Sequence, residues 1–244
     1  MTTTAHDNMS FLEHLEELRW HVIRSLIAII SAGFICFLMK DFIFDTIIFG
    51  PKKMDFPTYK FLCQAATFIG VETTFCGDEF PFVVQNRTMA GQFSAHVMTS
   101  VIAGFIISFP YVLYEFWKFI SPGLLAKEKS KSRGFIFISS LLFFIGVLFG
   151  YYIICPLSIN FLGTYQVSSE VLNEIDLGSF ISLVRSSAIA SGIIFELPII
   201  IYFLTKAGVV TPKSLVKYRK YALVLVLILA AIITPPDVAS QIIV

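Results

Sequence analysis

Charged residues are scarce in this chain of 244 residues, at 14% of the total against about 25% in ordinary soluble domains. Hydrophobic residues make up 56%, with 26 phenylalanines, and the mean hydropathy is +0.80. The net charge of +1 gives no basic surface for a nucleic acid. A soluble domain could not bury this much apolar surface, so we predict an all-α membrane protein.

Motifs of enzymes and metal sites are also missing. There is no His-Glu-x-x-His zinc motif, no Gly-x-Ser-x-Gly nucleophile elbow and no glycine-rich phosphate loop. The histidines are scattered, at His6, His14, His21 and His96, and no cysteine–histidine cluster suggests a metal. We therefore expect no catalytic residue, no metal ion and no cofactor.

A cleavable leader is not expected either. The first twenty residues are polar and mildly acidic rather than basic, and the apolar stretch that follows is longer than a signal-peptide core. This stretch should be retained as the first membrane span. No internal repeat is evident, which weakens an inverted-repeat transporter interpretation.

Apolar runs divide the chain into spans within one polytopic domain over residues 1–244. They cover roughly 20–48, 93–117, 134–157, 180–204 and 221–233, with the start of a sixth at 238–244. A spanning helix needs about 20 residues, which the first four runs reach. The fifth covers only about 20 Å. The sixth is too short to cross a bilayer, so we expect a truncated sixth span.

Basic residues orient the spans. Two of the short connecting segments are rich in lysine and arginine, whereas those after the third and fifth runs hold neither. The basic residues are Lys118, Lys127, Lys129, Lys131 and Arg133 in one segment, and Lys206, Lys213, Lys217, Arg219 and Lys220 in the other. The positive-inside rule then places both segments and the N-terminus in the cytoplasm. The loop over 50–92 would face outward.

Two carboxylates near the predicted cytoplasmic surface are candidates for binding a cation. Glu17 lies close to the bilayer edge, where an acidic group facing anionic lipid is otherwise unfavourable. A carboxylate can hold a guanidinium through two hydrogen bonds, so docking of an arginine is the functional interpretation. Stabilisation of the helix start is the alternative. Glu128 lies among lysines and would equally serve as a solvated loop charge.

Two further carboxylates lie within apolar runs. Glu196 is ten residues from Lys206 and thus roughly 15 Å deep at helical rise, which marks it as a functional candidate. A neutral Glu196 bonded to a neighbouring helix is the alternative, and Pro198 allows a kink nearby. Glu115 lies at the cytoplasmic end of the second run, where pairing with Lys118 or Arg19 is the simplest interpretation.

The cysteines fall into two groups. Cys36 and Cys155 lie inside apolar runs as small buried residues. Cys63 and Cys76 share one polar loop and would pair in an oxidising compartment. Two unpaired thiols are an equal alternative at this stage.

Four strings, taken in order, resemble the TatC family of the twin-arginine translocase. They are FLEHLEELR at 11–19, YEFWKFISPGL at 114–124 followed by Glu128-Lys129, FELP at 195–198, and TPPDV at 234–238 followed by Ser240-Gln241. Together they cover nearly the whole chain. Glu115 departs from the glutamine that many members carry, Val244 falls inside the sixth span of the family, and Cys63 and Cys76 match no part of the pattern.

The resemblance implies a six-span, glove-shaped receptor for the twin-arginine signal peptides of folded proteins, in a bacterial inner membrane or an organellar one. Transport would use the proton-motive force, with the single-span subunits TatA and TatB as partners and a homo-oligomer within the complex. Glu17 and Glu128 would hold the paired arginines, with Arg19 and Phe119 in support. Further implied roles are a polar group in the concavity for Glu196, partner docking for Thr234 and Gln241, and structural roles for Pro51 and Asp237.

Two other functions remain open at this stage. One is a proton- or ion-coupled transporter of small solutes centred on Glu196, although few intramembrane polar residues accompany it. The other is a purely structural membrane scaffold. Binding that depends on paired arginines would separate the receptor from both.

Overall fold

The computed structural model describes residues 11–70, 76–77, 80–120, 132–168, 170–206, 211, 216–221 and 224. The chain forms two compact units, each made of two separate stretches. Unit 1 comprises Met1–Leu38 and Ser100–Leu141, and unit 2 comprises Met39–Thr99 and Leu142–Val244. The predicted fifth run at 221–233 and the start of the sixth at 238–244 lie almost wholly outside the described residues.

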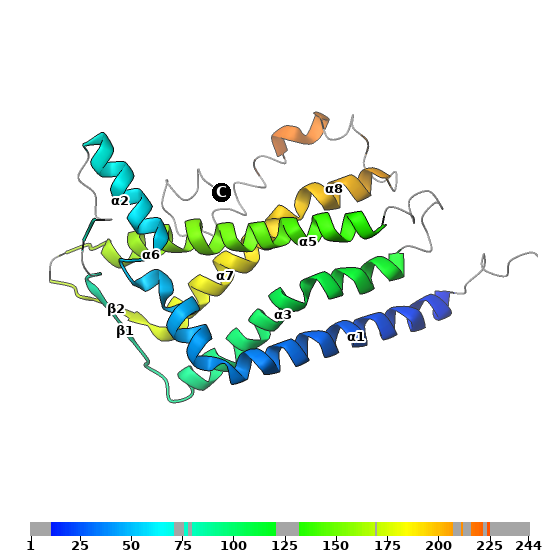
Figure 1. Ribbon diagram of the computed structural model, residues 1–244, viewed down its shortest axis with the longest axis horizontal. Helices are drawn as coiled ribbons and strands as arrows, with labels where there is room; N and C mark the ends of the chain where they lie inside the picture. The colour runs from blue at the N-terminus through cyan, green and yellow to red at the C-terminus, as the bar shows by residue number, and fades with distance from the viewer. Residues whose placement is uncertain are drawn as a thin grey trace, which may run out of the picture. The chain divides into compact units, whose positions relative to one another are not determined.

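Unit 1 is built on two long helices. Helix α1 covers Phe11–Leu38, and the later part of α3, which covers Gly91–Ile120, runs beside it (Figure 1). The helices meet at two glycines: a Cβ on Gly104 would lie 2.6 Å from the Gly33 Cα and 2.7 Å from the Ile29 carbonyl oxygen. Small residues allow such close backbone approach, which is how apolar helices associate in a membrane. The first part of α5, which covers Ser132–Phe149, completes the unit.

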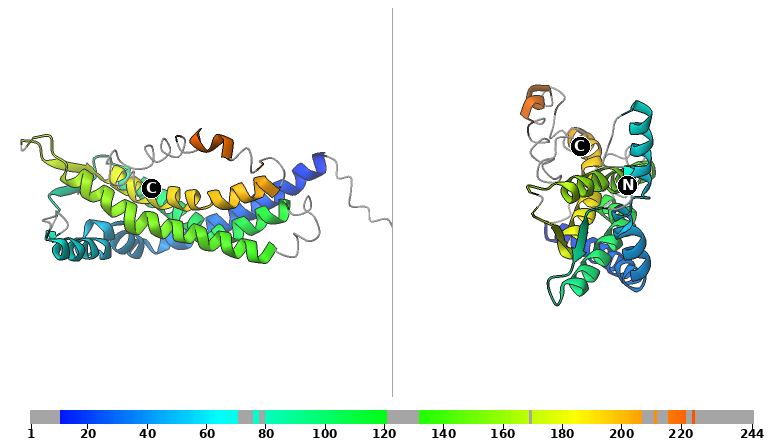
Figure 2. Two further views of the ribbon diagram at one scale, coloured as in Figure 1. Left: turned by 90° about the horizontal axis from the view of Figure 1, so that it is seen from above. Right: turned by 90° about the vertical axis from the view of Figure 1, so that its left-hand side faces the viewer.

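Unit 2 holds the shorter elements. They are the π-helical η1 (Phe42–Ile48), the 3₁₀ turn η2 (Gly50–Lys52), α2 (Pro57–Ile69), β1 (Phe82–Gln85), the π-helical η5 (Gly150–Ile154), α6 (Cys155–Thr164), β2 (Asn173–Asp176), α7 (Leu177–Phe195) and α8 (Leu197–Lys206). Figure 2 shows α5, η5 and α6 following one another as a nearly continuous helical rod. The core of unit 2 includes the buried side chains of Phe143, Ile154 and Ile181.

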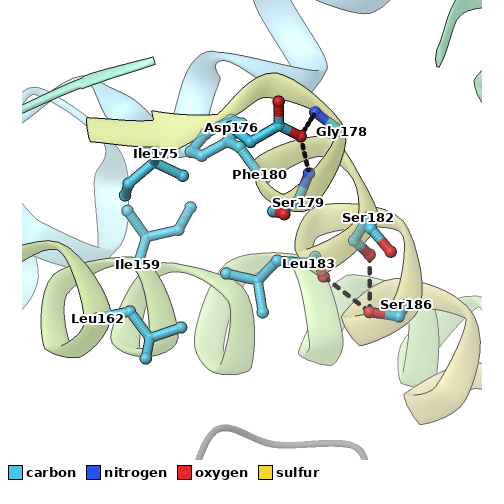
Figure 3. Close-up of a pocket in the computed structure, with 10 residues that line it drawn as sticks. All are labelled: Ile159, Leu162, Ile175, Asp176, Gly178, Ser179, Phe180, Ser182, Leu183 and Ser186. Carbon is cyan, nitrogen blue, oxygen red and sulfur yellow. Dashed lines mark hydrogen bonds between the residues drawn. The ribbon is translucent and has the colours of Figure 1, made fainter. Parts of the chain in front are cut away.

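A small parallel sheet joins two distant loops of unit 2. Strand β1 pairs with β2 in the register Phe82 to Asn173 through Gln85 to Asp176. Arg87 continues the link through a 3.1 Å ion pair with Glu174. The next element, α7, begins directly after β2: one carboxylate oxygen of Asp176 accepts hydrogen bonds from the N–H groups of Gly178 and Ser179 (Figure 3). This is an N-cap that fixes where the helix starts.

Tyr59 of α2 ties three segments of unit 2 together. Its side chain is 0% exposed, and its hydroxyl lies 2.9 Å from the carbonyl oxygens of both Pro51 and Pro156. Burial raises the pKa of Tyr59, so the hydroxyl stays protonated and able to donate. Pro51 is itself buried in η2, in the structural position expected for the end of the first apolar run.

Four helical segments are long and apolar enough to cross a membrane: Leu15–Leu38, Gly91–Ile120, Gly134–Thr164 and Leu177–Thr205. Many of their large apolar side chains are exposed, among them Ile30 at 67% and Leu38 at 68%. Faces of this kind are stable against lipid and not against water. The chain is therefore a predominantly helical membrane protein, as predicted.

Three details differ from the sequence prediction. The first α-helix ends at Leu38, and the predicted run 20–48 continues as the separate π-helical η1. The loop over 50–92 contains α2, which begins at Pro57, a residue favoured in a first helical turn. The two strands were not predicted, because four-residue strands give too short a pattern to recognise without their partner.

Candidate functional site

One acidic group of α1 is enclosed but unpaired. The Oε2 atom of Glu17 is buried and has no hydrogen-bond partner among the described residues, whereas its neighbour Glu16 is exposed. A buried acceptor without a donor costs free energy, about 1–3 kcal/mol for a neutral group and more for a charged one. The Oε2 atom of Glu17 therefore has an unused capacity to accept a hydrogen bond.

A buried ion pair lies one helical turn further along α1. The Nδ1 atom of His21 donates to Oε2 of Glu115 on α3 at 2.6 Å, and the Glu115 side chain is only 3% exposed. Arg24 approaches the same oxygen at 3.9 Å. Tyr111, one turn earlier on α3, also faces this carboxylate. A buried carboxylate needs such partners, because desolvation of the charge is otherwise uncompensated.

An aromatic ring of α3 borders this site. The rings of His21 and Phe119 lie edge to face with their centroids 6.3 Å apart. Trp117, two residues before Phe119 and therefore on another face of α3, is buried and packs on Phe135 of α5 at 4.7 Å between centroids. Because Glu17 and His21 are four residues apart on one helix, they share a face of α1. The site thus combines an unpaired carboxylate, a buried ion pair and the aromatic ring of Phe119.

The structure groups some of the predicted site residues and separates others. Glu17 lies on the same side of α1 as His21, which contacts Phe119. Arg19 is exposed, and a residue two positions from Glu17 points away from it on a helix. The predicted pairing of Glu115 with Lys118 or Arg19 was wrong: its ion-pair partners are His21 and Arg24, which lie on the face of α1 that meets α3.

Glu196 belongs to unit 2. It is 8% exposed and ends α7, and its carbonyl accepts hydrogen bonds from the N–H groups of Ile199 and Ile200 at the start of α8. The fourth span is therefore interrupted at Glu196, next to Pro198, where the sequence predicted a kink. The burial of Glu196 within the fourth candidate span agrees with an intramembrane polar residue. The role of Glu196 stays a prediction.

The remaining site predictions divide into described and undescribed residues. Cys63 and Cys76 are joined by a disulfide, while Cys36 and Cys155 are buried free thiols. Four predicted residues lie outside the described part of the chain, namely Glu128, Thr234, Asp237 and Gln241. Within the described ranges, no group of three or more His, Cys, Asp or Glu side chains could hold a metal ion.

Sequence reasoning missed His21, Arg24 and Arg185. His21 follows Glu17 by four residues, a spacing that places both on one helix face, and this signal went unused. Arg185 is the one basic residue in the apolar stretch between Leu177 and Leu204. The rule that drew attention to Glu196 applies equally to such an arginine.

The four candidate spans and the acidic, aromatic site of unit 1 define a multi-pass membrane protein built around carboxylates rather than a catalytic centre. The profile of the family "Sec-independent protein translocase protein (TatC)" matches residues 13–244. The chain belongs to the TatC family. It is therefore a receptor subunit of the twin-arginine protein translocase and not an enzyme.

Several relatives support this assignment. The TatC protein of Blattabacterium sp. subsp. Periplaneta americana is 46% identical over 239 residues, which cover 98% of this chain and 90% of the relative. TatC of Aquifex aeolicus is 35% identical, with 96% and 88% covered. A crystal structure of the twin-arginine translocase receptor TatC in DDM superposes with a TM-score of 0.72 at 33% identity, covering 94% of this chain and 92% of that one.

Proposed function

We propose that this chain binds the twin-arginine signal peptides of folded precursor proteins, with Glu17 as one of the two groups that receive the paired guanidiniums. The observation that carries the proposal is the buried, unpartnered Oε2 atom of Glu17. A guanidinium presents its donors in a planar fork that matches a carboxylate, whereas lysine supplies only a point charge. A receptor built on carboxylates would thus select arginine over lysine.

The second arginine would be held by Glu128, which follows the YEFWKFISPGL string in the position of the family motif. Phe119 would contribute an aromatic surface beside the guanidiniums, because arginine stacks favourably on such rings. Arg19 would support the site through its charge, although its side chain lies on a different face of α1 from Glu17. Lysines around Glu128 would repel loosely held cations and so sharpen selection.

The site lies on the cytoplasmic side in this proposal. The basic segments after the second and fourth apolar runs support an N-terminus on the inside, and the relatives are bacterial, which favours the bacterial inner membrane. The disulfide between Cys63 and Cys76 agrees with an outward loop over 50–92, because disulfides persist in oxidising compartments.

The complete receptor would be a glove-shaped bundle of six spans, assembled with TatA and TatB and with further copies of itself. Thr234 and Gln241 would dock the single-span partners, Asp237 would stabilise the last hairpin, and Glu196 would offer a polar group within the concave face. Movement of the folded cargo would draw on the proton-motive force, as membership of the family implies.

Binding of a twin-arginine peptide to purified protein tests this function. Glu17→Gln keeps the shape of the side chain and removes its charge, and we expect at least a tenfold loss of affinity, as for a buried charge-assisted contact. Glu16→Gln removes the same charge from the exposed neighbouring position and should leave the affinity nearly unchanged. Equal effects of the two variants would show that Glu17 acts only through the net charge of α1.

A further inference from the structure

Arg185 of α7 carries a charge that the described structure does not neutralise. It lies eight residues after Leu177 within the span Leu177–Thr205. Its Nε and Nη1 atoms are both buried without a hydrogen-bond partner, and no carboxylate lies within ion-pair distance among the described residues. Asp176, the nearest acidic residue in sequence, is occupied in capping the N–H groups of Gly178 and Ser179.

An uncompensated guanidinium in this setting is costly. Moving an ion away from water carries a penalty of several kcal/mol, which an unpaired charge does not recover. Charged residues within spans accordingly pair with one another, face water, or mark a binding site. The described surroundings of Arg185 supply no pair, so an anion from outside the described chain would complete it.

A cavity of about 390 Å³ borders Arg185 and gives such an anion access. Gly178 and Arg185 are seven residues apart and therefore lie on one face of α7, two turns from each other. The wall opposite comes from the start of α3 and the residues just before it, and its lining residues are Thr88, Ala90, Gly91, Ser94, Ala95 and Met98. All of these residues belong to unit 2.

The depth of the cavity indicates what kind of anion it receives. Arg185 is about 12 Å along α7 from its first residue at helical rise, and helical side chains lean toward the N-terminus of their helix. The cavity therefore reaches from the guanidinium to the level at which α3 and α7 begin. Helix starts in a membrane protein lie near the boundary between hydrocarbon and headgroups, which is the level of the lipid phosphates.

The residues that line the cavity favour a lipid over a free ion as the ligand. Thr88 and Ser94 contribute hydroxyl groups, and the first turn of α3 adds a partial positive charge from its backbone N–H groups. Ala90, Ala95 and Met98 form an apolar side, and Met98 is 55% exposed. A polar, positively charged end beside an apolar wall fits a headgroup that continues into glycerol and acyl chains.

We propose that this cavity binds the phosphate of an anionic phospholipid, with Arg185 as the residue that holds the phosphate. The lipid would supply the missing negative charge and fill the groove between α3 and α7 in unit 2. Inorganic phosphate offers the same hydrogen-bonding chemistry but cannot use the apolar wall. A carboxylate from another transmembrane chain is the competing occupant.

Native mass spectrometry of delipidated protein in a maltoside detergent tests the proposal. The three probes are phosphatidylglycerol, diacylglycerol with the same acyl chains, and inorganic phosphate. We expect phosphatidylglycerol to bind at least tenfold more tightly than either of the others. Arg185→Gln should weaken its binding by about tenfold, as expected for loss of a charge-assisted contact. Arg185→Lys should retain an intermediate affinity, because the charge remains without the planar fork.

Lys60→Gln is the matched control, since it removes one positive charge from an exposed position on α2. It should bind phosphatidylglycerol as the parent does. Because Arg185→Gln removes an unpaired, partly buried charge, its unfolding temperature without lipid should be no lower than that of the parent. If the unfolding temperature of Arg185→Gln is lower than that of the parent, the affinity of Arg185→Lys for phosphatidylglycerol becomes the test instead. An intermediate affinity would support the proposal, and an affinity equal to that of the parent would contradict it.

Three results would overturn the proposal. Unchanged binding of phosphatidylglycerol to Arg185→Gln would remove Arg185 from the site. Equal affinity for inorganic phosphate would make the ligand a free anion and not a lipid. Crosslinking from position 185 to a carboxylate-bearing helix of another subunit, without competition by phosphatidylglycerol, would assign the cavity to a protein partner.

Discussion

The imidazole of His21 and the carboxylate of Glu115 join α1 to α3 across 94 residues of sequence, with 2.6 Å between Nδ1 and Oε2. His21 also touches Phe119 and stands one turn from Glu17. The pair therefore connects the helix that carries the unpaired carboxylate to the helix that carries Phe119. It therefore holds Glu17 and Phe119, the described residues that we propose for peptide binding, at a fixed spacing.

A double-mutant cycle measures the coupling between these two residues. His21→Ala leaves the Glu115 carboxylate buried with Tyr111 and with Arg24 at 3.9 Å, so it should lower the free energy of unfolding by roughly 3–5 kcal/mol. Adding Glu115→Gln removes the stranded charge and should recover part of that loss. Thermal unfolding in detergent reports each variant. Strictly additive losses would mean that the two residues do not interact in solution.

Gly104 tests the close approach of α1 and α3. A Cβ at this position would lie 2.7 Å from the Ile29 carbonyl oxygen, so Gly104→Ala should force the helices apart and cost about 1–3 kcal/mol. Gly134 has no atom within 4 Å of the corresponding Cβ position, so Gly134→Ala serves as the control. It should be neutral or slightly stabilising, because alanine favours helix more than glycine does. Equal unfolding temperatures for the two variants would contradict the close packing.

The disulfide provides a test of orientation. Cys63 and Cys76 are 13 residues apart, and a loop of about this length contributes roughly 3 kcal/mol when closed by a disulfide. The variant with both cysteines changed to serine should unfold at a lower temperature. In spheroplasts, a membrane-impermeant thiol reagent should label the pair only after mild reduction. The buried thiols Cys36 and Cys155 should stay unlabelled, and their labelling would indicate an unfolded sample.

The sequence predicted the features that depend on composition and helical spacing. Runs of apolar residues located the four described spans, because a membrane imposes a minimum length that few other structures share. The family motif pointed to Glu17, and burial of an unpartnered oxygen there agrees with a receptor role. Pro198 indicated the interruption that the structure places at Glu196.

Features that depend on contacts between distant segments could not be predicted. The partner of Glu115 is one example. Lys118 is near Glu115 in sequence and Arg19 is a basic residue of α1, so both were predicted as partners. The face of α1 that meets α3 instead carries His21 and Arg24. The pairing of β1 with β2 joins strands of four residues, between which α3, α5, η5 and α6 lie in the sequence. The cavity beside Arg185 likewise exists only once α3 and α7 pack together.

The most direct test of the account is photocrosslinking from positions 17 and 128 to a twin-arginine signal peptide and to its twin-lysine variant. If the two carboxylates form one receptor for paired guanidiniums, both positions should crosslink the arginine peptide at the same site, and the lysine variant should reduce the yield at both by about tenfold. Crosslinking from only one position, or equal yields for the two peptides, would contradict the central claim.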